Sequence, residues 1–216
     1  MKILITGTSS GIGKETALKF LSMGHKVIGI DVKKSSIKDK NYIHYVADVS
    51  DYKSLPRIRG INILINNAGT QEEKKCIDVN LQGVINCSKK YGFQKEIKSI
   101  VNISSASSIT GAEFPSYVAS KGGVSSYTKY TALQLAKYGA TCNSLAFGGV
   151  ITKFNNHILK NEKLWGKVLN ETLLNKWADV KECAEWIYFV SSINKSMTAQ
   201  EILIDNGEMA KSNFIW

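Results

Sequence analysis

Short apolar runs alternate along the chain with longer segments of helical periodicity. Seven runs have the composition of strands, at residues 2–6, 26–31, 43–49, 61–67, 99–105, 142–147 and 201–205. Helices are predicted near 13–24, 75–91, 117–138 and 179–192. Strands that are almost continuous in Val, Ile and Leu are typical of a parallel sheet buried on both faces. The alternation therefore predicts an α/β fold with a Rossmann-type, doubly wound parallel sheet of about seven strands and helices on both faces.

The length of the chain bounds the number of such sheets. A chain of 216 residues suits one well-packed domain and is short for two. It contains only two prolines, and no Pro/Ser-rich or low-complexity stretch divides it. We therefore expect a single domain over residues 1–216.

Several classes of protein are disfavoured by the sequence. The apolar run in the first residues, MKILITG, is far too short for a signal peptide, and no stretch approaches the length needed to cross a bilayer. The four cysteines show neither CxxC nor Cys/His ligand spacing. We expect a cytoplasmic protein with no membrane partner, no metal site and buried free thiols.

The formal net charge is +10, which suits nucleic acid, a membrane surface or an anionic small molecule. The lysines occur in scattered pairs, as at 33–34 and 89–90, without an aromatic-interleaved stripe. This distribution favours a solvated lysine-rich surface. A nucleic-acid partner is therefore not expected, and binding to nucleic acid stays a minor hypothesis.

A glycine-rich segment, TGTSSGIG, lies between the first predicted strand and the first helix. Turns without Cβ atoms at Gly7, Gly11 and Gly13 let backbone N–H groups approach a diphosphate at the start of the helix. Asp31 ends the second strand about twenty residues later, where a carboxylate accepts hydrogen bonds from an adenosine ribose. The same carboxylate repels a 2′-phosphate, which the lysine pair at 33–34 partly counters. The predicted cofactor is NAD, with NADP as the alternative.

Tyr117 and Lys121 are four residues apart on a predicted helix and so share one face. Such pairs also occur by chance in many helices. A tyrosine with a pKa of roughly 10 is a poor base at neutral pH. One positive charge about 4 Å away contributes roughly 4 kcal/mol at an effective dielectric constant of about 20, which is enough to lower that pKa by about 2 to 3 units. We therefore expect Lys121 to prepare Tyr117 for acid and base catalysis.

Polar or glycine-rich clusters follow six of the predicted strands, where parallel sheets bind ligands. The segments TGTSSGIG, ADVS, NNAG, DVNLQG, NISS, YVASK and NSLAFGGVIT succeed one another along the chain. In this order and spacing, from Ile3 to about Gly207, the chain resembles the classical short-chain dehydrogenase/reductase family. The resemblance implies an NAD(H)-dependent oxidoreductase that transfers a hydride between nicotinamide and a secondary alcohol/ketone substrate.

The resemblance also implies roles for individual residues. Tyr117 is the acid/base, and Lys121 lowers its pKa and bonds the nicotinamide ribose. Ser105 bonds the substrate oxygen, and Asn80 holds a water for proton relay. Asp48 and Val49 would contact the adenine side, and Val150 and Thr152 the nicotinamide carboxamide. The implied cofactor-binding set is Gly7, Ser10, Gly11, Ile12, Gly13, Asp31, Asp48, Val49, Asn67, Ala68, Gly69, Tyr117, Lys121, Val150 and Thr152.

The chain departs from the family pattern in several places. Phe147-Gly148 stands where the family usually has Pro-Gly, so we expect a looser or differently shaped loop on the nicotinamide side. The segments on either side of NNAG are short, which indicates trimmed helices. Residues 153–178 are expected to form a substrate lid. The family implies a homodimer or homotetramer that assembles through the helices at 75–91 and 117–138.

Two questions stay open from the residues. Phe147 and the trimmed helices also suit a non-catalytic NAD(H)-binding sensor or scaffold with the same fold. Among substrates, steroids, sugars, polyols and 3-oxoacyl groups all fit a secondary alcohol/ketone chemistry.

Overall fold

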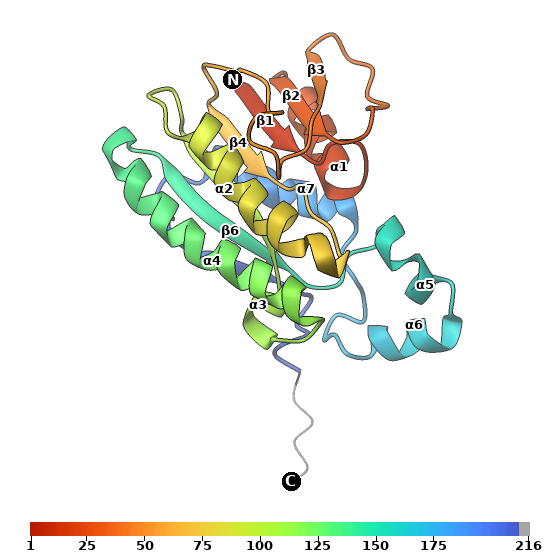
Figure 1. The fold of residues 1–216 in the computed structure, drawn as a ribbon. Coiled ribbons are helices and arrows are strands. Elements are labelled where there is room, and N and C mark those ends of the chain that lie inside the picture. Colours follow the sequence, from red (N-terminus) through yellow and green to blue (C-terminus); the bar gives the residue numbers. More distant parts are fainter. Residues whose placement is uncertain (212–216) are drawn as a thin grey trace.

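A seven-stranded parallel sheet forms the centre of the computed structural model, which describes residues 1–211 (Figure 1). The strand order is β3-β2-β1-β4-β5-β6-β7, and every neighbouring pair is parallel. The strands are β1 (Lys2–Thr6), β2 (Lys26–Asp31), β3 (Tyr42–Val46), β4 (Ile63–Asn66), β5 (Ser99–Ser105), β6 (Thr141–Phe147) and β7 (Glu201–Ile204). The predicted fold class is confirmed. The last five residues of the predicted 1–216 domain lie outside the described residues.

The order of the strands places a switch point between β1 and β4. The chain runs outward from β1 through β2 to β3, then returns to the other side of β1 and continues from β4 to β7. Ile3 of β1 pairs with Val27 on one side and Ile63 on the other. Ligands of doubly wound sheets bind beyond the carboxyl ends of the strands at such a point.

Helices cover the two faces of the sheet because successive strand residues point to opposite sides. Ile3 and Ile5 pack in one core with α1 (Gly11–Ser22) and α7 (Val180–Tyr188), through residues such as Phe20 and Ile187. Leu4 packs in the other core, which includes residues of α2 (Gly83–Cys87) and α4 (Pro115–Leu135). Figure 1 shows α2 and α4 on one side of the sheet and α1 and α7 on the other.

The helix predicted at 75–91 is a succession of different helical turns. It consists of the 3₁₀ turn η1 (Glu73–Lys75), the π-helical η2 (Ile77–Gln82), α2, and the π-helical η3 (Ser88–Gly92). Three other short helical segments are α3 (Ser107–Thr110), η4 (Ala136–Tyr138) after α4, and the π-helical η6 (Phe189–Ile193) after α7. π-Helical turns frequently occur near functional sites.

Two connections in the described chain contain no helix. Residues 32–41 join β2 to β3, and residues 47–62 join β3 to β4. The second agrees with the short segment that precedes NNAG in the sequence. β3 is an edge strand of the sheet, and its residues Ile43 and Val46 are exposed.

Residues 153–178 form a projection beside the sheet, with η5 (Lys153–Asn155), α5 (Asn156–Leu159) and α6 (Glu162–Leu169) (Figure 1). No residue of α6, all of which is described, is buried. The projection therefore adds little to the two cores of the sheet.

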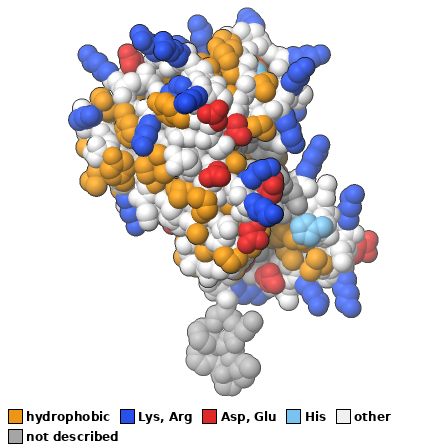
Figure 2. Space-filling view, in the orientation of Figure 1, with side chains coloured by type: hydrophobic (Ala, Val, Ile, Leu, Met, Phe, Trp, Pro, Cys, Tyr) orange, Lys and Arg blue, Asp and Glu red, His pale blue; other side chains and the backbone are white. Residues whose placement is uncertain are grey.

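The surface and the cysteines follow the sequence-based expectations. Figure 2 shows Lys and Arg side chains spread around the visible face rather than gathered in one stripe. All four cysteines are buried and free, as predicted: Cys76, Cys87, Cys142 and Cys183. Within residues 1–211 we find no helix that is both long and apolar enough to cross a membrane.

Candidate active site

A cleft of about 540 Å³ lies beyond the carboxyl ends of the strands. Its walls come from the segments that follow β1, β2, β4, β5 and β6, together with part of the 153–178 projection. Thirteen of the predicted site residues line it: Gly7, Ser10, Gly11, Ile12, Asp31, Asn67, Ala68, Gly69, Ser105, Tyr117, Lys121, Val150 and Thr152. The predicted glycine-rich loop and the predicted Tyr/Lys pair therefore face one cavity.

The glycine-rich loop has the geometry that a diphosphate requires. Gly7 has φ +77°, and a Cβ there would lie 2.9 Å from the Ala68 Cα. A Cβ on Gly11 would meet no heavy atom of the described chain within 4 Å, so this face of the loop is open. Ser10, the N-cap of the twelve-residue α1, makes no side-chain capping bond in the described structure. The first N–H groups of α1 thus face the cleft and fit an anionic ligand.

Asp31 lies at one end of the cleft, beside Val32 and Lys33. Its Oδ2 accepts a hydrogen bond from the Ser9 N–H at 2.9 Å, and its Oδ1 accepts one from the Lys33 N–H at 2.9 Å. Each carboxylate oxygen retains capacity for a further donor. This end of the cleft therefore fits the ribose hydroxyls of an adenosine, and we refer to it as the adenosine end.

The loop after β4 is bound to the end of β1 by Thr6, a residue that the sequence analysis did not single out. The Thr6 hydroxyl oxygen accepts hydrogen bonds from the backbone N–H groups of Asn67 and Ala68, both at 3.0 Å. The Asn67 amide donates to the Thr6 carbonyl at 2.9 Å. These bonds hold Asn67, Ala68 and Gly69 against the glycine-rich loop.

Ser105, Tyr117 and Lys121 meet at the other end, which we call the catalytic end. Ser105 is the last residue of β5, and α4 carries the other two; Phe114 is its extended N-cap and Pro115 its first residue. The Lys121 ammonium donates to the Ile103 carbonyl at 2.9 Å and lies 5.6 Å from the centre of the Tyr117 ring. Strand and helix are therefore joined by the lysine itself.

The order in which Tyr117 and Lys121 ionise differs from the sequence-based expectation. Burial raises the pKa of Tyr117, while a hydrogen bond with Ser105 lowers it less. Burial lowers the pKa of Lys121 to about 8. Lys121 therefore loses its charge before Tyr117 loses its proton, and no net lowering of the tyrosine pKa results. The expected lowering of the Tyr117 pKa is therefore wrong, because burial acts on both Tyr117 and Lys121.

Asn80 is buried in the π-helical η2 and does not line the cleft. Its Oδ1 accepts from the Thr70 N–H at 2.7 Å, and its Nδ2 donates to the Thr70 carbonyl at 3.0 Å and to the Ser120 hydroxyl at 3.1 Å. Asn80 thus connects η2 with the cleft-lining residue Thr70 and with α4. Its role in a proton relay stays a prediction.

Three other predicted residues lie away from the walls of the cleft. Gly13 packs behind the glycine-rich loop, where a Cβ would lie 2.2 Å from the Gly7 carbonyl oxygen. Val49 is buried in a core of the sheet. Asp48 is exposed, and its Oδ1 accepts from the Ser50 N–H at 2.9 Å. The adenine-side contacts of Asp48 and Val49 stay predictions.

The loop after β6 is well attached, in contrast to the expectation from Phe147. Phe147 is a buried residue of β6 that pairs with Ser105, and its carbonyl accepts from the Ala106 N–H at 2.8 Å. The Gly148 N–H donates to the Ile204 carbonyl at 3.0 Å. Strands on both sides therefore hold this loop without a proline.

Three acidic residues lie at the catalytic end, and two of them, Glu171 and Glu208, were missed by the sequence analysis. Glu113, Glu171 and Glu208 all line the cleft. Burial raises the pKa of Glu208, and repulsion from Asp205, Glu171 and Glu113 raises it further. Of these two, only Glu208 follows a strand closely enough to be found from the sequence, because Glu171 comes from a loop with no motif.

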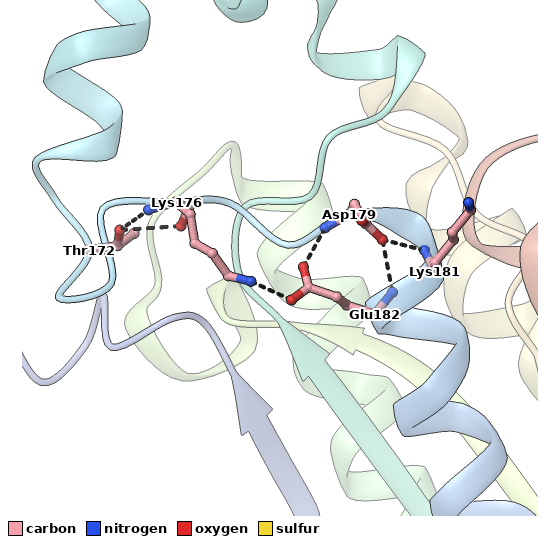
Figure 3. Close-up of polar contacts among 5 residues, drawn as sticks. All are labelled: Thr172, Lys176, Asp179, Lys181 and Glu182. Carbon is pink, nitrogen blue, oxygen red and sulfur yellow. Dashed lines mark hydrogen bonds and ion pairs between the residues drawn. The ribbon is translucent and has the colours of Figure 1, made fainter.

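The carboxyl-terminal part of the 153–178 projection is fastened to the start of α7 (Figure 3). The Thr172 hydroxyl accepts from the Lys176 N–H at 3.1 Å, and the Lys176 ammonium pairs with Glu182. Asp179 caps α7, with the Glu182 side chain bonded back to the Asp179 N–H at 2.9 Å.

Backbone bonds add to this attachment. The Ile151 N–H donates to the Ala178 carbonyl at 2.9 Å, and the Ala178 N–H to the Gly149 carbonyl at 3.1 Å. Trp177 lies so close to Gly149 that a Cβ there would be 2.1 Å from the indole. Trp177 is thereby placed as a wall of the cleft.

Comparisons with known proteins find a matching family model and similar relatives. The model of the family described as short chain dehydrogenase matches residues 1–163. A 3-oxoacyl-[acyl-carrier-protein] reductase of Thermotoga maritima is 32% identical over 237 aligned residues, which cover 94% of this chain and 96% of the relative.

Solved structures are similar over almost the whole chain. A 4-hydroxyisoleucine dehydrogenase mutant complexed with NADH and succinate has a TM-score of 0.89 and 27% identity, with 99% of this chain and 100% of that chain covered. The structure of ElxO with NADP bound has a TM-score of 0.85 and 26% identity, with 97% and 99% covered.

Proposed function

Because the chain belongs to the short-chain dehydrogenase family, we propose that it is an oxidoreductase that transfers a hydride between a nicotinamide dinucleotide and a secondary alcohol or ketone. The observation that carries the proposal is the meeting of Ser105, Tyr117 and Lys121 in a cleft whose other end holds an open glycine-rich loop and Asp31. The adenosine end fits a dinucleotide, and the catalytic end fits a group that exchanges a proton.

The cofactor would be held by the residues that line the cleft. The start of α1 and the glycine-rich loop would bind the diphosphate, Asp31 the adenosine ribose, and Val150 and Thr152 the nicotinamide side. When bound, the nicotinamide supplies or accepts the hydride. Two of the similar structures hold NADH and NADP, respectively, which supports the dinucleotide class without choosing between them.

Tyr117 is the proposed proton donor in ketone reduction. Its raised pKa keeps the phenol protonated at neutral pH, so that it can donate a proton to the oxygen as the hydride reaches the carbon. Ser105 would donate a hydrogen bond to the same oxygen. The Lys121 ammonium, whose pKa is about 8, is a stronger acid than the phenol and can return a proton to the phenolate.

We propose NAD as the preferred cofactor, because Asp31 places a carboxylate where NADP would carry a phosphate. A parallel fluorescence titration with NADH and NADPH tests this preference. Asp31→Ser is expected to reduce the ratio of the NADPH Kd to the NADH Kd by about tenfold, since about 1.4 kcal/mol of repulsion corresponds to that factor. An unchanged ratio would assign the choice of cofactor to other residues.

The proposed substrate is a neutral or cationic ketone rather than an anionic one. Glu113, Glu171 and Glu208 line the catalytic end, where burial raises the pKa of Glu208 and repulsion from Asp205, Glu171 and Glu113 raises it further. A substrate carboxylate there would add a fourth negative charge. We propose that residues 153–178 act as a lid over this end, because Trp177 of that segment forms one wall.

A set of ketones that differ only in charge tests the substrate class. We expect kcat/KM to be lowest for the carboxylate member and higher for the neutral and ammonium members. The highest kcat/KM with the carboxylate would contradict the proposal.

We further propose a homodimer or homotetramer that uses the helical segments 73–92 and 115–138. The exposed Tyr130 and Leu133 on α4 support this face, because large apolar side chains there would be covered by a second copy. Light scattering after size exclusion gives the mass. Leu133→Lys should shift an oligomer toward the monomer, whereas Leu18→Lys on α1 serves as a control.

The main experiment is the transfer of deuterium from stereospecifically labelled NADH to a panel of ketones. Label in the alcohol product, with its absence in Tyr117→Phe, would support the oxidoreductase. Binding of NADH without transfer to any ketone would instead favour the alternative, a non-catalytic nucleotide-binding protein of the same fold.

A further inference from the structure

The connection from β2 to β3 contains no helix, yet the residues that face the cleft in it are firmly held. The carbonyl oxygen of Lys33 accepts two hydrogen bonds, from the Ser9 hydroxyl at 2.8 Å and from His44 Nε2 at 2.8 Å. Lys33 lines the adenosine end directly beside Asp31. The backbone of Lys33 is therefore held from the glycine-rich loop on one side and from β3 on the other.

The bond from His44 belongs to a chain of polar side chains. His44 Nδ1 lies 3.0 Å from the Tyr42 hydroxyl, which lies 2.9 Å from the hydroxyl of the buried Thr8. A carbonyl oxygen only accepts, so His44 Nε2 donates to the Lys33 carbonyl. The Tyr42 hydroxyl donates to the Thr8 hydroxyl. The bonds thus connect the glycine-rich loop, through β3, with the Lys33 carbonyl.

Gly29 in the middle of β2 provides the space for this chain. A Cβ at this position would lie 2.1 Å from the Tyr42 hydroxyl oxygen and 2.3 Å from the Thr8 hydroxyl oxygen. Glycine inside a strand weakens it and commonly marks a close approach of other groups. Here the approaching groups are the two hydroxyls, and the absence of a side chain at Gly29 leaves room for them.

Asp31 holds the same short piece of backbone by a second route. Its two carboxylate oxygens accept from the N–H groups of Ser9 and Lys33. The N–H and the carbonyl of Lys33 are therefore both bonded, one to Asp31 and the other to His44 and Ser9. Loss of the His44 bond would leave the carbonyl side of Lys33 held only by a serine hydroxyl.

We propose that Tyr42 and His44 are positioning residues for the adenosine half of the dinucleotide. By holding the Lys33 carbonyl they orient Asp31 and Lys33 toward the ribose, and so they set the affinity for NADH and the preference for NADH over NADPH. This inference rests on the proposed function. Loss of the bond to the Lys33 carbonyl weakens the binding of NADH more than that of NADPH. The ribose of NADH depends on a fixed Asp31 carboxylate, whereas a mobile Lys33 ammonium can still reach the 2′-phosphate of NADPH.

The test compares Kd values for NADH and NADPH in Tyr42→Phe, His44→Phe and His44→Gln. Tyr42→Phe keeps the ring and removes only the hydroxyl, and His44→Gln offers an amide that can both donate and accept. Tyr45→Phe, on the same strand, is the matched control, since the exposed Tyr45 is not part of the chain of bonds. Thermal unfolding of each variant reports stability separately.

We expect Tyr42→Phe and His44→Phe to raise the Kd for NADH by about two- to tenfold, the range for loss of one hydrogen bond, and the Kd for NADPH by less. His44→Gln should recover part of the loss. The kcat at saturating NADH should stay as in the wild type, because the catalytic end is not touched. Tyr45→Phe should leave both Kd values unchanged.

Two failures are distinguishable. A wild-type protein that binds neither dinucleotide would overturn the proposed function, and this inference with it. Wild-type binding of NADH together with unchanged Kd values in folded Tyr42→Phe and His44→Phe would overturn the inference alone. A fall in unfolding temperature without a change in Kd would likewise show that the chain of bonds only stabilises the edge of the sheet.

Discussion

The two ends of the cleft are built in different ways. At the catalytic end, Ser105 belongs to a buried strand, and Tyr117 and Lys121 belong to the 21-residue helix α4. At the adenosine end, no helix lies between β2 and β3 within the described chain, and side-chain hydrogen bonds hold the backbone at Asp31 and Lys33. One end is placed by the packing of whole elements, whereas the other depends on single polar atoms.

This difference predicts where a side-chain substitution should shift the backbone and where it should change only the rate of the reaction. Substitution of Tyr117 would remove the proposed proton donor and leave β5 and α4 in place. Substitution of Tyr42 or His44 would alter the position of the backbone that we propose binds the ribose. The following experiments test this contrast, beginning with the largest effect.

Tyr117→Phe gives the sharpest test of the catalytic end. We expect kcat for ketone reduction to fall by about 10²- to 10⁴-fold, the usual contribution of a positioned general acid, while the Kd for NADH changes little. Steady-state kinetics and the NADH titration measure the two quantities. A parallel loss of NADH binding would mean that the two ends are not independent.

The pH dependence of reduction tests the role of Lys121. The charged form of Lys121 is present below its pKa of about 8 and is lost as the pH rises above it. We therefore expect kcat for reduction to be level near pH 7 and to fall by up to about tenfold per pH unit above about 8. A profile that stays flat to pH 10 would remove Lys121 from the proton-supplying role.

Gly29→Ala tests whether the packing around Gly29 of β2 supports the adenosine end. Its Cβ would collide with the hydroxyls of Tyr42 and Thr8, so we expect the free energy of unfolding to fall by about 1 to 3 kcal/mol. The Kd for NADH should also rise, with kcat at saturating NADH preserved. Gly122→Ala on α4 is the control, because its Cβ would meet nothing within 4 Å in the described structure.

Asp179→Ala should have the smallest effect, although it acts close to the catalytic end. Removal of the cap of α7 should lower the free energy of unfolding by about 1 kcal/mol, and Asp179→Ser should restore most of it. We expect kcat to stay nearly unchanged, because the bonds between Ala178 and the loop at 149–151 still hold Trp177. A large fall in kcat would show that capping of α7 positions the cleft wall.

Much of the fold and part of the site can be predicted from the sequence, because both depend on patterns along the chain. Apolar runs mark all seven strands, and parallel strands bring their carboxyl ends to one edge. The position of Asp31 follows from its place after the second strand, and that of Tyr117 from its motif. These properties are local, so one sequence is sufficient to predict them.

Other features depend on contacts between distant segments. The folded protein buries both Tyr117 and Lys121, so the pKa of Tyr117 rises and the pKa of Lys121 falls, contrary to the expected lowering of the Tyr117 pKa. The acidic catalytic end combines loops that are far apart in the sequence. The chain of bonds through Tyr42 and His44 has no motif, and only the isolated Gly29 in an apolar strand signals it.

The four buried cysteines can report local opening of the native protein. Burial raises the pKa values of the Cys87 and Cys183 thiols to about 12, so at neutral pH neither their accessibility nor their ionisation favours reaction. An alkylating reagent should modify each thiol only when the surrounding structure opens. Cys183 lies on α7 and Cys87 on α2, on opposite faces of the sheet. Their separate labelling rates would compare the stability of the two faces without any introduced probe.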